Sequence, residues 1–235
     1  MGQSIHLTAA DGASFAAYVA QPLTPLFAKP RGAVVVLQEI FGVNAHIRAV
    51  ADGYAQEGYW VIAPSTFARV KPGVELGYTP EDIGVGFGLK AAVEALPAPG
   101  VLQDIQTAVD HALQASAGRV AVLGYCWGGL LTWRSACELQ RISAAVPYYG
   151  GGMTEPGEAE RIPRCPVLAH FGDRDPYISN DSVAAFAASH ATQGVQVQVY
   201  SANHGFNCDQ RASHDAAAAA LARERTLAFL AQHIG

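Results

Sequence analysis

The stretch Val120-Ala121-Val122-Leu123-Gly124-Tyr125-Cys126-Trp127-Gly128-Gly129 decides the fold predicted for this chain. Its apolar first half is typical of a buried strand, and the residues that follow, 130–134, have helical character. A strand, a sharp turn flanked by glycines and a helix form the setting of a nucleophile elbow, usually written G-x-S-x-G, with cysteine here at the serine position. The glycines leave room for a strained central residue at the top of a sheet. The alternative is a buried cysteine in an ordinary strand-to-helix turn.

Apolar runs and helical segments alternate along the rest of the chain. Two short strands are expected within 4–20 around Asp11-Gly12, and a proline-rich link from Gln21 to Pro30 follows. Further strands are expected at 32–37, 59–63, 119–123, 143–148, 166–171 and 195–200, and helices near 46–57, 82–95, 101–116, 127–139, 180–191 and 213–233. This alternation predicts a mostly parallel, three-layer α/β sheet with helices on both faces. With no repeat or composition break, we expect a single domain over residues 1–235.

Composition narrows the function classes. The 235 residues are 50% hydrophobic and 15% charged, and the formal net charge is −5. No basic stripe is present, so we expect no nucleic-acid partner. No signal peptide is visible and the apolar runs are too short to span a bilayer, so we expect a cytoplasmic protein without a membrane partner. It is expected to be a monomer or small homo-oligomer.

The four cysteines are Cys126, Cys137, Cys165 and Cys208. They form no CxxC pair, which argues against a structural zinc site, and no metal is expected. In a reducing compartment they would be free thiols. Cys137 and Cys165 are expected in the core.

A cysteine nucleophile needs a base, and the base needs a group that orients it. Asp175 follows the apolar run 167–171, and His204 follows the strand expected at 195–200. Both therefore lie beyond the carboxyl ends of strands, where the active sites of parallel sheets form. The order nucleophile, acid, histidine is that of the α/β hydrolases. Asp173 competes with Asp175; we prefer Asp175 for its Gly-x-x-Asp turn and assign Asp173 to the turn itself.

Several motifs together resemble those of the dienelactone hydrolase family of the α/β hydrolases. The matching segments are 38–42 (QEIFG), 124–129 (GYCWGG), 148–151 (YYGG), the turn at Asp175, and 204–206 (HGF). They extend from about residue 30 to the C-terminus. The resemblance implies a three-layer α/β-hydrolase fold and a hydrolase of small esters or lactones, similar to carboxymethylenebutenolidase.

The resemblance also implies roles for individual residues. Cys126 would attack the substrate carbonyl and form a thioester, His204 would transfer protons, and Asp175 would hold the His204 ring. Backbone N–H groups of Ile40 and Trp127 would form the oxyanion hole. The substrate would be a small-molecule ester or lactone, and no cofactor is required.

Glu39 ends a buried strand, where an unpaired carboxylate is costly. One interpretation is a loop carboxylate paired with a basic side chain. The other, which the resemblance supports, places Glu39 beside Cys126. A nearby anion disfavours the thiolate and protects the resting thiol from oxidation until substrate displaces Glu39.

The chain departs from the family where substrate is held. Family members that act on dienelactone have an arginine four residues after the catalytic histidine, where this chain has Cys208. The segment 80–89 also lacks an arginine, although Arg69, Lys71 and Lys90 lie near it. Arg211 is a possible substitute, although a surface role fits it better. The natural substrate therefore stays open.

Other residues near the expected site are ambiguous. Phe41, Tyr78, Tyr148 and Trp127 are candidates to line it, but each fits core packing equally well. The run Gly84-Val85-Gly86-Phe87-Gly88 lacks the spacing of a nucleotide-binding loop, and we expect a flexible segment bordering the pocket.

Two other function classes stay open. One is a non-catalytic protein of hydrolase fold that binds a small ligand or senses redox state through Cys126 and Cys208. The other is an enzyme that hydrolyses or transfers acyl groups of thioesters, which the same triad supports.

Overall fold

The computed structural model describes residues 2–22, 30–116 and 118–235, and the strands of this part form one eight-stranded sheet. The strands are β1 (Gln3–Thr8), β2 (Ser14–Ala20), β3 (Ala33–Leu37), β4 (Trp60–Pro64), β5 (Val120–Tyr125), β6 (Ala144–Tyr148), β7 (Val167–Gly172) and β8 (Val195–Tyr200). Their order is β1-β2-β4-β3-β5-β6-β7-β8. β1 and β2 form the expected hairpin, β2 is antiparallel to β4, and every other pairing is parallel. Most of the proline-rich link, residues 23–29, lies outside the described residues.

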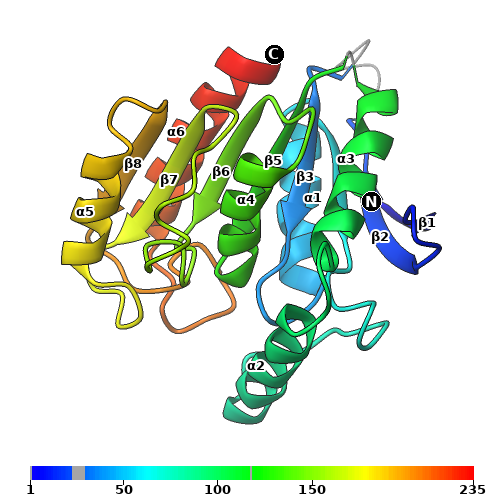
Figure 1. The fold of residues 1–235 in the computed structure, drawn as a ribbon, viewed down its shortest axis with the longest axis horizontal. Helices are drawn as coiled ribbons and strands as arrows, with labels where there is room; N and C mark the ends of the chain where they lie inside the picture. Colours follow the sequence, from blue (N-terminus) through cyan, green and yellow to red (C-terminus); the bar gives the residue numbers. More distant parts are fainter. Residues whose placement is uncertain (1, 23–29, 117) are drawn as a thin grey trace.

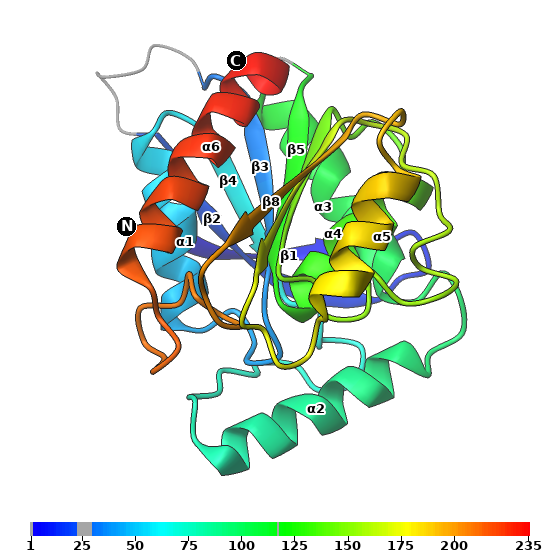
Figure 2. The ribbon, with the colours of Figure 1, turned by 90° about the vertical axis from the view of Figure 1, so that its left-hand side faces the viewer.

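Helices cover both faces of the sheet, which confirms the predicted α/β class (Figures 1 and 2). They are α1 (Ala45–Gln56), α2 (Pro80–Glu94), α3 (Val101–Ala115), α4 (Trp127–Glu138), α5 (Asn180–Ser189) and α6 (Ala216–Ile234). In Figure 2, α1 and α6 lie on one side of the sheet, and α3, α4 and α5 on the other. α2 belongs to neither layer and lies below the sheet in both views.

The central strands form because their residues are apolar without interruption. All residues of β3 and β5 are buried, as a parallel sheet covered on both faces requires. The two strands pair in register from Ala33↔Val120 to Leu37↔Gly124. The segments that follow β3, β5, β7 and β8 therefore meet at one edge of the sheet, and these segments contain Glu39, Cys126, Asp175 and His204.

The helix predicted near 82–95 is confirmed, and because it includes the glycine-rich segment 84–88, our expectation of a flexible segment there is wrong. The segment lies within α2, which begins after a capping box in which Thr79 and Asp82 bond to each other's backbone N–H groups. Pro80 at the first helical position is compatible with this start. The strong N-terminal signal outweighs the low helix propensity of three glycines.

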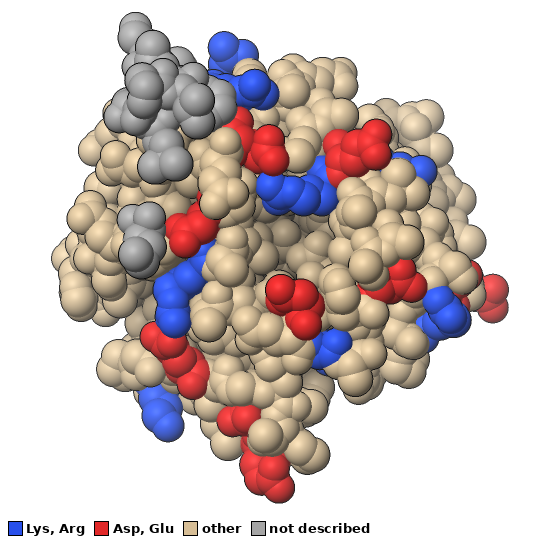
Figure 3. Space-filling model, turned by 180° about the vertical axis from the view of Figure 1, so that it is seen from behind, with Lys and Arg blue, Asp and Glu red and all other residues tan. Residues whose placement is uncertain are grey.

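The described residues contain no helix long and apolar enough to cross a membrane. On the face shown in Figure 3, acidic and basic side chains are interspersed, and neither kind gathers into a broad patch.

Candidate active site

Cys126 occupies the single position between β5 and α4. Its backbone has φ 55° and ψ −117°, a conformation that residues other than glycine rarely adopt. Its N–H donates to the carbonyl of Tyr148 (3.0 Å), and its own carbonyl accepts from Gly129 (2.9 Å). These bonds and the flanking strand and helix hold the strained residue in place, as is common at functional sites.

The glycines around Cys126 are required by close backbone contacts. A Cβ on Gly124 would overlap the carbonyl of Gly128, and a Cβ on Gly128 would overlap the carbonyl of Leu37. The elbow thus packs directly against the end of β3. Larger residues would separate Cys126 from the segment that contains Ile40.

His204 and Asp175 form a buried pair beside the elbow. Nδ1 of His204 lies 2.7 Å from Oδ2 of Asp175, and the two residues are 7% and 8% exposed. The other carboxylate oxygen of Asp175 accepts from the N–H of Tyr177 (2.9 Å). Asp173 instead has a half-exposed carboxylate near Arg174. Of the two candidate acids, Asp175 is therefore the one in contact with His204.

The charge state of His204 depends on its neighbours. Burial, the largest influence, acts to lower the pKa of His204, but the Cys126 and Asp175 groups outweigh it and raise this pKa to about 10. The Cys126 and Asp175 groups therefore increase the proton affinity of the His204 ring, which suits His204 to take a proton from a cysteine nucleophile.

Glu39 is buried and paired with Arg211, which agrees with the first of its two interpretations. Glu39 is 1% exposed, and its Oε1 accepts from Nη1 of Arg211 (3.3 Å). The Arg211 side chain is only 19% exposed and lies over the Phe41 ring at 5.7 Å, so the surface role expected for it is wrong. Burial acts to lower the pKa of Arg211, whereas Glu39 and then Cys126 raise it. Arg211 thus interacts with both groups.

A cavity of about 250 Å³ opens beside Cys126 and His204. Its apolar wall is formed by Ile40, Phe41, Ile83, Phe87, Trp127 and Tyr177. Two cationic side chains, Lys90 and Arg211, also line it. Ile40 and Trp127, whose N–H groups the family resemblance assigns to the oxyanion hole, both reach this cavity, and the N–H groups in the first turn of α4 have no intrahelical acceptor.

Three residues expected at the substrate site do not line this cavity. Tyr148 is fully buried, and its side chain points to the face of the sheet that α6 covers. Its hydroxyl lies there 2.6 Å from Oγ1 of Thr226 in α6. Tyr78 packs edge-on against Phe41 (ring centroids 4.6 Å apart) and accepts from Asn44. Cys208 is fully buried in the same region, where burial and Glu39 raise its pKa to about 11.

Sequence reasoning missed three side chains of the cavity, Ile83, Phe87 and Tyr177. Ile83 and Phe87 are four residues apart on α2, on one face of the helix, and Phe87 is half-exposed. Tyr177 lies two residues after Asp175, and its ring stands edge-on to that of His204 at 5.2 Å. The helix predicted near 82–95 already contained the signal for the first two, because residues four positions apart share one helix face.

The mostly parallel sheet and the cavity at its carboxyl edge define an α/β hydrolase. The model of the dienelactone hydrolase family matches residues 15–234. The chain belongs to the dienelactone hydrolase family, and it is accordingly a hydrolase of carboxylic esters or lactones.

Similar proteins agree with this assignment. A carboxymethylenebutenolidase of Pseudomonas putida is 32% identical over 235 residues, which cover 97% of this chain and 96% of that protein. The crystal structure of a Klebsiella pneumoniae protein, provisionally named a dienelactone hydrolase, superposes on this chain with a TM-score of 0.81. The two sequences are 32% identical, and the match covers 99% of this chain and 100% of the other. A dienelactone hydrolase-like promiscuous phosphotriesterase from metagenomic libraries shares the fold, with TM-score 0.76, 22% identity and coverage of 100% and 99%.

Proposed function

We propose that this hydrolase cleaves small esters or lactones with Cys126 as nucleophile, His204 as general base and acid, and Asp175 as the group that orients His204. The observation that carries the proposal is the 2.7 Å bond between Nδ1 of His204 and Oδ2 of Asp175, beside a cavity that Cys126 lines. This bond keeps a proton on Nδ1 and leaves Nε2 to exchange a proton with the Cys126 thiol.

The reaction would proceed in two halves. The Cys126 sulfur attacks the carbonyl carbon, and the N–H groups of Ile40 and Trp127 donate to the oxyanion that forms. His204 then protonates the departing oxygen, and a thioester remains on Cys126. A water that gives its proton to His204 hydrolyses the thioester, which releases the acid and restores the thiol.

The cavity suggests a substrate with an acidic group. Lys90 and Arg211 line it in place of the family arginines, but each is already near a carboxylate, Glu94 at 3.5 Å and Glu39 at 3.3 Å. We infer that a substrate carboxylate binds Arg211 and weakens its pair with Glu39. Displacement of Glu39 would then remove an anion from the surroundings of Cys126 and favour the thiolate.

The test compares cis- and trans-dienelactone with uncharged p-nitrophenyl acetate, using wild type and Cys126→Ala. The matched control is Cys165→Ala, which removes a buried thiol from the segment before β7. We expect Cys126→Ala to lower kcat/KM for the lactones at least about 10³-fold, as loss of a nucleophile does. Cys165→Ala should retain activity.

The outcomes separate the alternatives. If only the uncharged ester is hydrolysed and its hydrolysis depends on Cys126, the mechanism is supported and the inference that the substrate bears a carboxylate is contradicted. Turnover that does not change in Cys126→Ala contradicts the thioester mechanism. In that case, reversible formation of a Cys126–Cys208 disulfide becomes the measurement for the redox-sensing alternative.

A further inference from the structure

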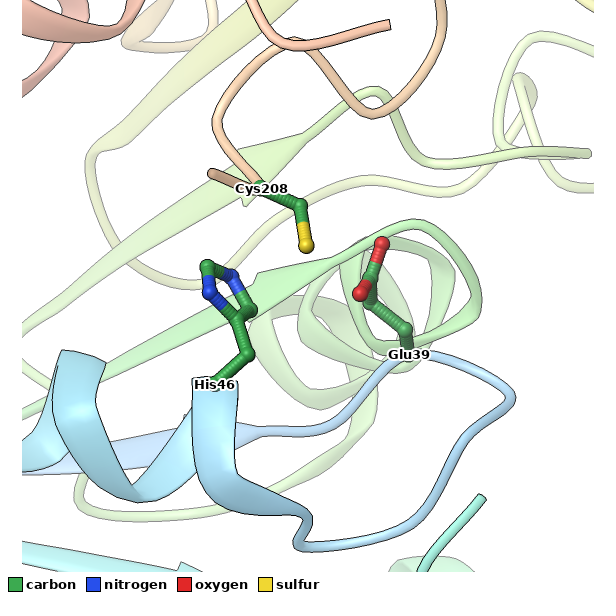
Figure 4. Close-up of side chains that lie close together, drawn as sticks. All are labelled: Glu39, His46 and Cys208. Carbon is green, nitrogen blue, oxygen red and sulfur yellow. The ribbon is translucent and has the colours of Figure 1, made fainter. Parts of the chain in front are cut away.

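Three potential metal ligands that are distant in the sequence converge behind the catalytic cavity. Glu39 follows β3, His46 lies in the first turn of α1, and Cys208 lies in the loop before α6. Their ligand atoms all lie within 4.8 Å of one another. The residues are 1%, 4% and 0% exposed, and in Figure 4 the three side chains point toward a common space.

Two of these ligand atoms lack a partner. Among the described residues, neither Oε2 of Glu39 nor Nε2 of His46 has a hydrogen bond, although both atoms are buried. A buried polar atom without a partner costs about 1–3 kcal/mol, and more when the group is charged. Such atoms are rare in native structures, and two that face the same space indicate a ligand there.

The tautomer of His46 is suited to metal binding. Its Nδ1 lies 3.1 Å from Oδ1 of Asp209, and this carboxylate oxygen accepts a hydrogen bond from the Nδ1–H. The ring nitrogen that is left to offer a lone pair is then Nε2, which has no partner among the described residues. A carboxylate that holds the far nitrogen of a ligating histidine is the usual second shell of zinc sites.

We propose that Glu39, His46 and Cys208 bind one divalent cation of borderline softness, for which Zn²⁺ is the fitting ion. A set of one carboxylate oxygen, one imidazole nitrogen and one thiolate suits zinc, whereas Mg²⁺ and Ca²⁺ prefer oxygen alone. As the metal–sulfur bond forms, the Cys208 proton leaves to solvent, and no electron is transferred.

The geometry requires only a small contraction. Three atoms within 4.8 Å of one another lie at most about 2.8 Å from a common centre, and zinc–ligand bonds are about 2.0–2.3 Å. With three protein ligands, the fourth position stays open, as in sites that exchange a ligand. His46 and Asp209 also line a cavity of about 220 Å³, which gives the cluster a route toward solvent.

Occupancy would affect the neighbouring catalytic site through Glu39. The metal and Arg211 would share this carboxylate, since Oε1 already accepts from Arg211 while the buried Oε2 has no partner among the described residues. The sequence predicted no zinc site because the cysteines form no CxxC pair. That criterion detects only ligands that are close in sequence. This cluster joins residues up to 169 positions apart (208 minus 39).

The test measures Zn²⁺ binding calorimetrically in the Cys126→Ala chain, so that the catalytic thiol cannot bind the ion. We expect one Zn²⁺ per chain, and a thiolate-to-metal charge-transfer band when Co²⁺ is used instead. Adding Cys208→Ser should abolish the band and weaken Zn²⁺ binding by more than about 100-fold, since loss of a second-shell group alone costs about 10- to 100-fold. Adding Cys165→Ser, the matched buried-thiol control, should change neither.

A second variant tests the site even if Cys208→Ser does not fold. Asp209 has a side chain that is 71% exposed, so Asp209→Asn should fold, and it should weaken Zn²⁺ binding about 10- to 100-fold. Absence of Zn²⁺ binding in the Cys126→Ala chain, or binding that Cys208→Ser leaves unchanged, overturns the proposal. These measurements do not depend on hydrolysis, so the metal site and the proposed mechanism can fail separately.

Discussion

At the scale of single residues, the buried pair of Glu39 and Arg211 lies beside the catalytic cavity, and the proposed function uses this pair to link substrate charge to Cys126. Glu39 is almost completely buried, and the guanidinium that neutralises it lines the cavity. A buried carboxylate with one partner is costly to leave unpaired, so any ligand that takes Arg211 also destabilises the position of Glu39. In the proposed function, Arg211, seven residues after His204, takes the role of the cationic group that is absent four residues after that histidine.

Replacing Glu39 tests this link. Glu39→Gln removes the negative charge and leaves the positive charge of Arg211 near Cys126, which favours the thiolate. We therefore expect the pH profile of Cys126 alkylation to move toward lower pH. The control is Glu158→Gln, which breaks an ion pair with Arg134 at a different site. An unchanged profile in Glu39→Gln would remove Glu39 from control of the thiol.

At the scale of elements, α2 forms the outer wall of the catalytic cavity. Its residues Ile83, Phe87 and Lys90 line the cavity, and Glu94 near its end accepts from the indole N–H of Trp127 (3.0 Å). Its three glycines are not equivalent. Gly86 packs against the backbone of Ile40, whereas Gly84 and Gly88 have open space where a Cβ would be. Close approach of the helix to Ile40 is therefore the reason for one glycine only.

Alanine substitutions at Gly86 and Gly88 of α2 should have different effects, the first on activity and the second on stability. A Cβ at Gly86 overlaps the carbonyl of Ile40, so Gly86→Ala should push the helix outward, displace the Ile40 N–H and lower kcat. A Cβ at Gly88 would have no neighbouring atom within 4 Å, so Gly88→Ala should stabilise the helix by about 0.5–1 kcal/mol. Urea unfolding and ester hydrolysis of both variants provide the measurement. Equal activity in the two variants would contradict the packing role of Gly86.

At the scale of the whole molecule, a buried histidine joins the sheet to α6. His170 in β7 lies 2.8 Å from the Tyr200 hydroxyl in β8 through Nδ1, and 3.0 Å from Oγ1 of Thr226 in α6 through Nε2. His170 is fully buried, and burial, followed by the charge of Arg225, lowers its pKa to about 3. The folded state thus holds His170 neutral.

This neutral histidine makes folding sensitive to acid. The unfolded chain binds a proton at His170 near pH 6.5, whereas the folded chain does so only near pH 3. Its contribution to stability is therefore complete above about pH 6.5 and is lost as the pH falls toward 3, with a slope approaching about 1.4 kcal/mol per pH unit. We expect His170→Gln to be less stable at neutral pH but to lose less stability on acidification.

The measurement is the free energy of unfolding in urea between pH 4 and pH 8. The control is His6→Gln, which alters an exposed histidine in β1 and should keep the acid slope of wild type. The same slope in His170→Gln would assign the acid sensitivity to other groups.

The sequence by itself determined the order of elements, the elbow and the segments that contain the proposed triad. Strand 195–200 agrees with β8, and the boundaries of the helix predicted at 127–139 agree with α4 to within one residue. Apolar runs, glycines and capping residues act on neighbours only a few positions away, so the sequence alone reveals their patterns. The meeting of Cys126, Asp175 and His204 follows because the carboxyl ends of parallel strands share one edge.

Only the tertiary structure decided which side chains meet across that edge. Arg211 and Glu39 are 172 residues apart, and nothing local distinguishes a buried arginine from a surface one. The same applies to α2, whose weak amphipathic pattern does not reveal that it closes the cavity. The cluster of Glu39, His46 and Cys208 likewise depends on two loops and the first turn of α1 brought together by the packing of separate elements, because side-chain proximity is set by the fold and not by sequence spacing.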